Sequence, residues 1–159
     1  MQIHATCCAY DAAGGPGGVL LLGPPGSGKS DLALRLIDAG FALVADDRVD
    51  IEVGAGGAFA SAPAALAGLL EVRGIGIIRL GRGVPRARIA LAVTLSPRAE
   101  QERLPEQART ALAGHAVPTI PVDPEAPSAV ARIRLALDVL EGRAESRCGA
   151  LGDSAAAAP

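Results

Sequence analysis

The chain has 159 residues, half of them hydrophobic, and its only aromatic residues are one tyrosine and two phenylalanines, so its length allows one domain with an aliphatic core. Its formal net charge of −2, with no long run of one sign, argues against a nucleic-acid-binding surface. The sequence lacks the about 18 consecutive apolar residues of a membrane span and the basic start of a signal peptide. We therefore expect a cytoplasmic protein with no membrane and no nucleic-acid partner.

The first part of the chain alternates predicted strands with one helix. Apolar runs of period two, or unbroken ones, indicate the strands, and glycine- and proline-rich segments indicate the turns. The predicted elements here are strands at 3–10 and 19–22, a helix at 31–37, and strands at 41–45, 49–53 and 58–60. Gly40 suits the C-cap of the helix, and the glycine-rich segment 54–57 joins the last two strands into a hairpin.

The second part ends in a clear amphipathic helix. Its predicted elements are a short helix at 64–67, strands or turns at 69–72 and 75–80, a strand at 89–95, a polar, partly helical segment at 102–113, an edge strand or extended segment at 117–122, and the amphipathic helix at 128–140. Segment 117–122 is confined to an edge because its two prolines lack N–H donors. We expect one domain over 1–142 and a disordered tail over 143–159.

The only lysine of the chain, Lys29, stands in a complete G-x-x-x-x-G-K-S phosphate loop. The loop consists of Gly23, Pro24, Pro25, Gly26, Ser27, Gly28, Lys29 and Ser30. Its glycines let backbone N–H groups surround phosphate oxygens, the lysine reaches the β/γ-phosphates, and the serine hydroxyl ligates magnesium. A buried strand precedes the loop and a helix follows it, which is the context that a true phosphate site requires.

Asp46 and Asp47 follow the next predicted strand. Ligands bind beyond the carboxyl ends of strands in open α/β sheets, so the pair faces the γ-phosphate if that strand neighbours 19–22. One carboxylate can hold magnesium and the other can accept a proton from an attacking hydroxyl. A solvated turn, or an ion pair with Arg48, is the alternative.

Glu71 and Arg73 open a second distinctive segment, Leu70-Glu71-Val72-Arg73-Gly74-Ile75-Gly76-Ile77-Ile78. The two charged residues are two positions apart and point the same way on a strand, and Gly74 and Gly76 permit close backbone approach. A surface ion pair followed by a turn would give the same pattern.

The adjacent Cys7 and Cys8 are interpreted as buried thiols on opposite faces of a strand. His115 is interpreted as structural or exposed. The three cysteines, an odd number, lack metal-ligand spacing.

Taken together, the phosphate loop, Leu43-Val44-Ala45-Asp46-Asp47-Arg48-Val49 and the segment 70–78 resemble the bacterial HPr kinase/phosphorylase family in order and spacing. His4 resembles the family's histidine upstream of the loop, and Arg103-Leu104 resembles its later Arg-Leu. The resemblance covers about residues 3 to 140, the catalytic domain. It implies an α/β fold of the P-loop kinase type similar to phosphoenolpyruvate carboxykinase, with a mixed sheet and flanking helices.

The resemblance also implies an activity, cofactors and partners. The activity is that of a serine kinase that uses ATP and Mg²⁺ to phosphorylate an HPr-like phosphocarrier protein of the phosphotransferase system. The kinase is implied to be a homo-oligomer, namely a hexamer. By this resemblance, Lys29 binds the transferred phosphate, Ser30 and Glu71 bind the metal, and Asp47 accepts the serine proton with support from Asp46. Arg103 neutralises charge on the phosphoryl group, and His4 forms a hydrogen bond in the site. Further active-site contacts come from Arg73, Gly74 and Gly76.

Two features of the sequence depart from the family pattern. His4 lies near the start of the chain, so we expect the family's amino-terminal domain to be absent. A Pro-Val-x-x-Gly-Arg-type segment linked to dephosphorylation is replaced by Ile120-Pro121-Val122-Asp123-Pro124-Glu125, so we expect weak or altered phosphorolysis. A small-molecule kinase and a non-catalytic nucleotide-sensing protein are the alternatives.

Overall fold

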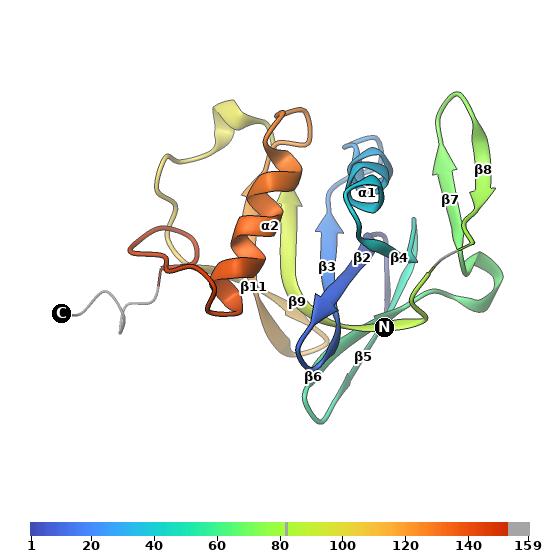
Figure 1. Ribbon diagram of the computed structural model, residues 1–159, viewed down its shortest axis with the longest axis horizontal. Coiled ribbons are helices and arrows are strands. Elements are labelled where there is room, and N and C mark those ends of the chain that lie inside the picture. Colours follow the sequence, from blue (N-terminus) through green and yellow to red (C-terminus); the bar gives the residue numbers. More distant parts are fainter. Residues whose placement is uncertain (82, 153–159) are drawn as a thin grey trace.

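The computed structural model describes residues 1–81 and 83–152, which form a curled mixed sheet with two helices on one face (Figure 1). The strands are β1 (Gln2–Ile3), β2 (Thr6–Ala12), β3 (Gly15–Leu22), β4 (Ala42–Ala45), β5 (Val49–Gly54), β6 (Gly57–Ser61), β7 (Leu69–Val72), β8 (Gly76–Arg79), β9 (Arg86–Leu95), β10 (Ala108–Leu112) and β11 (His115–Val122). The helices are α1 (Lys29–Asp38) and α2 (Ala129–Leu140), with 3₁₀ turns at Ala64–Leu66 and Arg98–Glu100.

Strand β9 organises the main sheet. It pairs in parallel with β3 along one side, while β6 and β11 share its other side, β6 antiparallel at the start and β11 parallel at the end. The main path runs β1-β5-β6-β9-β3-β2-β4, and β10 joins through β11. β7 and β8 form a separate two-stranded hairpin. The carboxyl ends of β3 and β9 therefore meet at one edge of the sheet.

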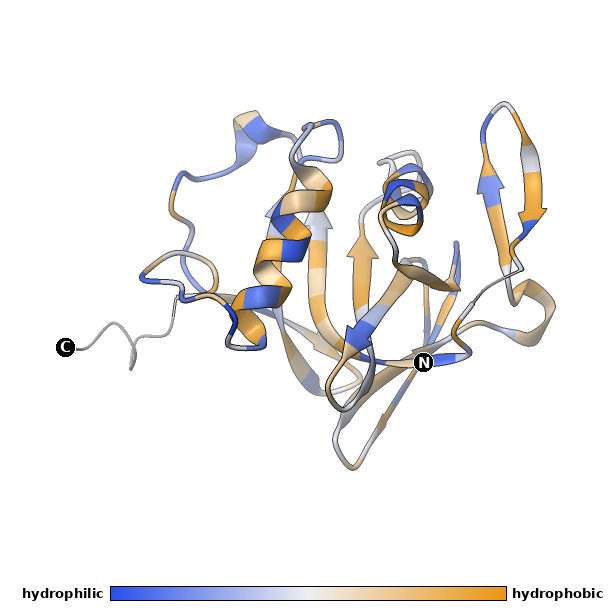
Figure 2. Cartoon of the chain, in the orientation of Figure 1, coloured by the Kyte–Doolittle hydropathy of each residue, from blue (hydrophilic) through white to orange (hydrophobic). Residues whose placement is uncertain are grey.

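Two apolar clusters hold the layers together. One packs Leu32 and Leu36 of α1 and Ile133 and Leu137 of α2 against the sheet. The other fills the concave face where β5 and β6 curl back. The continuous apolar runs of β3 and β9 appear in orange between these layers (Figure 2). Strands with both faces buried need such runs rather than alternation, which is why these elements were readable from sequence.

Most of the predicted elements are confirmed with small boundary shifts, as are the mixed sheet and its flanking helices. The strand predicted at 3–10 is divided into β1 and β2. The predicted helix at 31–37 begins two residues earlier, at Lys29. The short helix predicted at 64–67 is a single 3₁₀ turn.

The partly helical segment predicted at 102–113 is wrong, because its ordered part is strand β10. Ala113 and Gly114 both have positive φ values, 48° and 87°, and they turn β10 back into β11. Two consecutive positive φ values are what a tight hairpin needs. Alanine seldom adopts this conformation, so nothing before Gly114 indicated that the turn closes a hairpin with a strand on its other side.

The edge position predicted for 117–122 is also wrong, since β11 lies between β9 and β10. Pro118 pairs only with β10, and Pro121 pairs only with β9. Each proline thus has a strand partner on one side alone, and the strand tolerates the missing N–H donors.

Residues 143–152 continue past α2 in turns, and Ala150 and Leu151 pack against the helix-side cluster. The disorder predicted for the tail stays a prediction for 153–159, which lie outside the described residues.

Candidate functional site

The loop between β3 and α1 has the backbone shape of an anion cradle. Gly26 and Gly28 have φ values of 79° and 100°, a region that favours glycine. A Cβ at Gly23 would lie 2.5 Å from the Ser27 Oγ, so that position has no room for a side chain. Because α1 begins at Lys29, its first N–H groups lack intrahelical acceptors and border the loop.

The polar side chains of the loop retain capacity for a phosphate. Lys29 Nζ donates to the carbonyl oxygens of Gly23, at 2.7 Å, and Pro24, at 3.0 Å. An ammonium group carries three donors, so one remains available. The Ser27 Oγ is buried and finds no hydrogen-bond partner in the part of the chain that the structure describes. Both features fit a nucleotide phosphate bound in the loop.

Asp46 is only 6% exposed, and three donors surround its carboxylate. The hydroxyls of Thr6 and Ser30 donate to Oδ1 at 2.9 and 2.7 Å, and the Glu71 N–H donates to Oδ2 at 3.2 Å. This network joins β2, α1, β4 and β7 at one point. A buried carboxylate held in this way fixes the side chain of Ser30 in the phosphate loop.

Asp46 reaches the loop although β4 does not neighbour β3. We expected the Asp pair to face the γ-phosphate if its strand neighbours β3, but β2 lies between the two strands. Thr6, at the start of β2, bridges the gap by its bond to Asp46. The Asp pair thus stands at the predicted edge of the sheet through a different strand order.

Asp47 has surroundings opposite to those of Asp46. It is exposed, and its backbone is left-handed with a φ of 69°. A non-glycine residue pays a conformational cost there, and such strain is concentrated at functional sites. Asp47 lines a cavity of about 510 Å³ beside the phosphate loop. The same cavity is lined by Thr6, Pro25, Gly26, Gly28, Lys29, Ser30, Asp31, Leu34, Glu71, Val72 and Arg73.

The β7–β8 hairpin forms the outer wall of this cavity. Glu71 and Arg73 both line it, although only Glu71 is on the strand, because β7 ends at Val72 and Arg73 lies in the turn. Gly74 and Gly76 turn the hairpin with φ values of 86° and 128°. The first part of segment 70–78 therefore borders the cavity beside the phosphate loop.

A second cavity of about 530 Å³ borders the other side of the loop. Ser27 and Gly28 line it together with Pro97, Asp123 and Pro124 from the connections that follow β9 and β11. The phosphate loop thus separates an acidic cavity, with Asp47 and Glu71, from a second cavity with a proline-rich wall.

Of the predicted site residues, His4, Gly23, Asp46, Gly74, Gly76 and Arg103 line neither cavity, and His4 and Arg103 also lie away from the phosphate loop and its Asp46 network. His4 is exposed in the bend between β1 and β2, and no hydrogen bond joins it to the Asp pair among the described residues. Arg103 is exposed in the connection between β9 and β10, and this connection runs on the α2 side of the molecule (Figure 1). Their predicted roles stay predictions.

Thr6 and Arg35 are site residues that the sequence analysis missed. Thr6 is fully buried and bonds Asp46, while Arg35 lines the second cavity and donates to the Pro124 carbonyl oxygen. Neither belongs to a motif. A threonine opening an apolar strand is the one signal that could have drawn attention to Thr6.

The described residues contain no group of three or more His, Cys, Asp or Glu side chains that could hold a metal ion. This finding suits Mg²⁺, which takes one or two protein ligands, substrate phosphates and water rather than a full protein cage. Ser30 and Glu71 both border the cavity and could supply those ligands. No helix among the described residues is long and apolar enough to cross a membrane.

Cys7 and Cys8 face the two opposite apolar clusters, as predicted. Burial, followed by the charge of Asp46, raises the pKa of Cys8 to about 12. Burial, followed by Cys8, raises the pKa of Cys7 well above its ordinary value. Both side chains are therefore neutral thiols that serve packing.

Comparisons with known proteins agree with this geometry. The family model of the HPr serine kinase C-terminal domain matches residues 11–133. The HPr kinase/phosphorylase of Clostridium tetani is 52% identical over 61 residues, which cover 38% of this chain and 20% of the relative. That of Lactobacillus acidophilus is 39% identical over 103 residues, covering 58% and 32%. The chain thus spans about a fifth to a third of the length of these curated relatives.

A solved structure extends the likeness over most of the chain. The Hpr(Ser) kinase/phosphatase from Coxiella burnetii matches with a TM-score of 0.72 and 27% identity. The match covers 90% of this chain and 96% of that one.

Proposed function

The chain belongs to the HPr serine kinase C-terminal domain family, and on this premise we propose that it is an ATP-dependent protein kinase that phosphorylates a serine of an HPr-like phosphocarrier protein of the phosphotransferase system. The relatives it resembles are kinase/phosphorylase enzymes by name. The observation that carries the proposal is the contrast between two adjacent carboxylates. Asp46 is buried and fully bonded, while Asp47 is exposed to the cavity that Lys29 lines.

ATP with Mg²⁺ fits the residues of the loop. The free donor of Lys29, the N–H groups that open α1 and the unpartnered Ser27 hydroxyl would hold the β- and γ-phosphates. Ser30 and Glu71 would hold Mg²⁺, which supplies charge neutralisation on the transferring phosphoryl group. The nucleoside would lie in the second cavity, against Pro97 and Pro124.

Asp47 would accept the proton of the attacking serine hydroxyl. Its carboxylate is exposed, so it can meet an acceptor that arrives from solvent. Asp46 cannot take this role while three donors occupy its oxygens, and it instead positions Ser30. Phosphoryl transfer depends mostly on such positioning and on charge stabilisation.

A protein acceptor fits the outer wall better than a metabolite does. Ile75 and Ile77 of the β7–β8 hairpin are 73% and 71% exposed beside Glu71 and Arg73. Exposed aliphatic side chains next to an open active site suit contact with a folded partner. A small-molecule kinase would leave them without a function.

The reverse reaction is proposed to be weak. In the reverse direction an oxygen of inorganic phosphate attacks the phosphorus of the phosphoserine and the bond from that phosphorus to the serine oxygen breaks. Pyrophosphate forms, and the leaving serine oxygen takes a proton from the protonated Asp47. Asp123 and Glu125 place two carboxylates on the loop after β11, and Asp123 is held by the N–H groups of Arg98 and Glu125. Carboxylates at this wall repel an incoming phosphate. Efficient pyrophosphate formation from the phosphorylated carrier would contradict this part.

The test is transfer of label from γ-labelled ATP with Mg²⁺ to the HPr-like carrier of the same organism. Wild-type protein should give serine-linked label, and Asp47→Asn should reduce the rate at least about 100-fold while ATP still binds. Asp50→Asn on β5 is the matched control, because Asp50 contacts Gln2 outside the cavity. Bound ATP with no labelled carrier would favour the small-molecule kinase or the nucleotide-sensing protein instead.

A further inference from the structure

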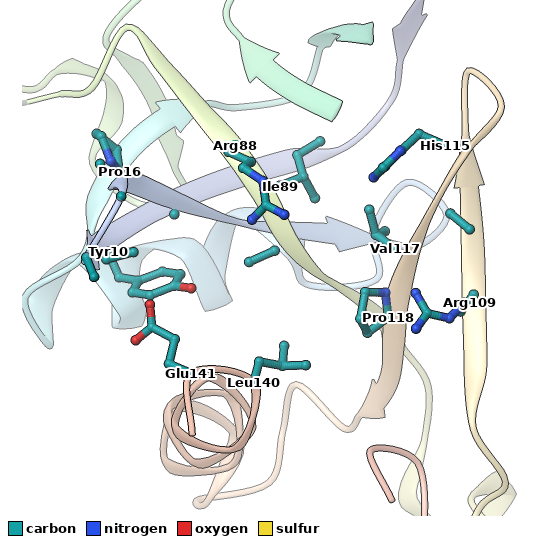
Figure 3. Close-up of a pocket in the computed structure, with 17 residues that line it drawn as sticks. Tyr10, Pro16, Arg88, Ile89, Arg109, His115, Val117, Pro118, Leu140 and Glu141 are labelled. Carbon is teal, nitrogen blue, oxygen red and sulfur yellow. The ribbon is translucent and has the colours of Figure 1, made fainter. Parts of the chain in front are cut away.

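A third cavity, here called the distal cavity, lies at the opposite end of the sheet from the phosphate loop (Figure 3). It has a volume of about 510 Å³ and is formed by the β2–β3 hairpin, the start of β9, the β10–β11 hairpin and the end of α2. Strand β3 has eight residues between its start at this cavity and its end before the phosphate loop. At about 3.3 Å per residue, the two sites are roughly 23 Å apart.

Three basic side chains converge on the distal cavity. Figure 3 shows Arg88 and His115 directed towards its middle and Arg109 at its edge beside Pro118. Arg88 is oriented by a bond from Nε to the Gly56 carbonyl oxygen at 2.6 Å, which leaves its terminal amino groups available. In the described part of the chain, no carboxylate forms a salt bridge with Arg88 or Arg109.

The one carboxylate in the wall is already neutralised. Glu141 forms an ion pair with Arg143 and lies beside the Tyr10 hydroxyl. Burial, followed by Glu141, raises the pKa of Tyr10, so its hydroxyl remains a hydrogen-bond donor at neutral pH. The cavity therefore keeps a positive excess from Arg88 and Arg109.

The rest of the wall is apolar. Ile89, Val117 and Pro118 line it beside the basic groups, Leu140 lines it from α2, and the Tyr10 ring closes one side. The ring packs so closely on Gly17 that a Cβ there would lie 2.5 Å from it. A cavity with convergent cations and an apolar wall is suited to a ligand that has an anionic group and an apolar part.

We propose that the distal cavity is a binding site for a small organic phosphate, separate from the nucleotide site. Arg88 and Arg109 hold the phosphate by charge-assisted hydrogen bonds, with His115 as a further donor. The organic part packs against Pro118, Leu140 and the Tyr10 ring. The site does not depend on the proposed kinase activity, because it shares no lining residue with the phosphate-loop cavities.

Calorimetric titration with phenyl phosphate tests the site. Wild-type protein should bind with a Kd of about 1 mM or tighter, and the Arg88→Gln/Arg109→Gln double variant should bind at least about 10-fold more weakly. Arg132→Gln on α2 removes one positive charge outside the cavity and should bind like wild type. Lys29→Met, which disables the phosphate loop, should also retain binding. Circular dichroism of each variant verifies folding.

Inorganic phosphate is the second probe and should bind several-fold more weakly than phenyl phosphate, because it cannot use the apolar wall. Leu140→Ala should weaken phenyl phosphate and leave inorganic phosphate unchanged. The proposal is overturned if phenyl phosphate gives no binding to the wild type, or if Lys29→Met abolishes it. Equal affinity for the two probes would also overturn it.

Discussion

Asp46 and Asp47 show how far two neighbouring residues of one type can differ. The first carboxylate is enclosed by donors from Thr6, Ser30 and Glu71, and the second is exposed on a left-handed residue. The difference arises in the bend that follows β4, which ends at Ala45. Within this bend the first side chain is buried and the second is exposed.

Removing the Thr6 hydroxyl should destabilise the protein through Asp46. Thr6→Val is nearly isosteric but leaves a buried carboxylate with one donor fewer. The free energy of unfolding should fall by about 1–3 kcal/mol. Urea unfolding measures it, with Thr6→Ser as the control that keeps the hydroxyl. An unchanged midpoint in Thr6→Val would contradict the assigned network.

The buried thiols should make stability decline at alkaline pH. In the unfolded chain Cys8 ionises near its ordinary pKa of 9.0, whereas in the folded protein its pKa is about 12. The folded protein favours the neutral thiol. Its contribution to the free energy of unfolding is therefore complete below about pH 9 and is lost as the pH rises towards 12. The slope is at most about 1.4 kcal/mol per pH unit for each thiol.

Urea unfolding at about pH 8 and about pH 10.5 measures this slope. Cys8→Ala should lower stability at both pH values, because it leaves a cavity, but it should reduce the dependence on pH. An equal slope in wild type and variant would show that Cys8 is not the group that titrates.

At the scale of elements, the β7–β8 hairpin stands apart from the main sheet. Its two strands pair only with each other. It is anchored by Leu70, which is fully buried in the helix-side cluster, and by the bond from the Glu71 N–H to Asp46. The element that carries Glu71 and Arg73 into the site can therefore open without disturbing β3 or β9.

Gly74→Ala should weaken this hairpin locally. Gly74 has a φ of 86° and open space around it, so alanine meets only the cost of a left-handed backbone, about 1–2 kcal/mol. Amide hydrogen exchange in β7 and β8 should accelerate about 10-fold, while exchange in β3 stays the same. Gly54→Ala is the control, because Gly54 has the same free space without a positive φ. Acceleration in β3 as well would mean that the hairpin and the sheet unfold together.

At the scale of the whole molecule, the position of Arg103 does not match its predicted role in the site of its own chain. It is exposed and outside the cavity that holds Lys29 and Asp47. Its proposed role in neutralising the phosphoryl group would then require a second copy of the chain to bring it to the site. This interpretation rests on the proposed kinase activity and homo-oligomer.

Mixing two inactive variants tests this arrangement. Arg103→Ala and Lys29→Met should each have little kinase activity alone. Mixed oligomers of the two should recover up to about a quarter of wild-type activity, because some sites combine an intact Lys29 with an intact Arg103 from the neighbour. Arg98→Ala, in the same connection, is the control and should remain active. Mixtures without recovery would place Arg103 outside the reaction or in its own chain's site.

The sequence by itself determined the local features of this protein. The phosphate loop, the buried strands around it, the Asp pair and both main helices were readable, because glycine spacing and apolar periodicity act over a few residues. Tertiary structure decided which elements meet: β2 between β3 and β4, β11 inside the sheet, Thr6 on Asp46, and the basic walls of the distal cavity. Arg88 and Arg109 lie on strands that are far apart in sequence and carry no motif. Their convergence follows only from the pairing of β9 and β10 with β11, which is a property of long-range contacts.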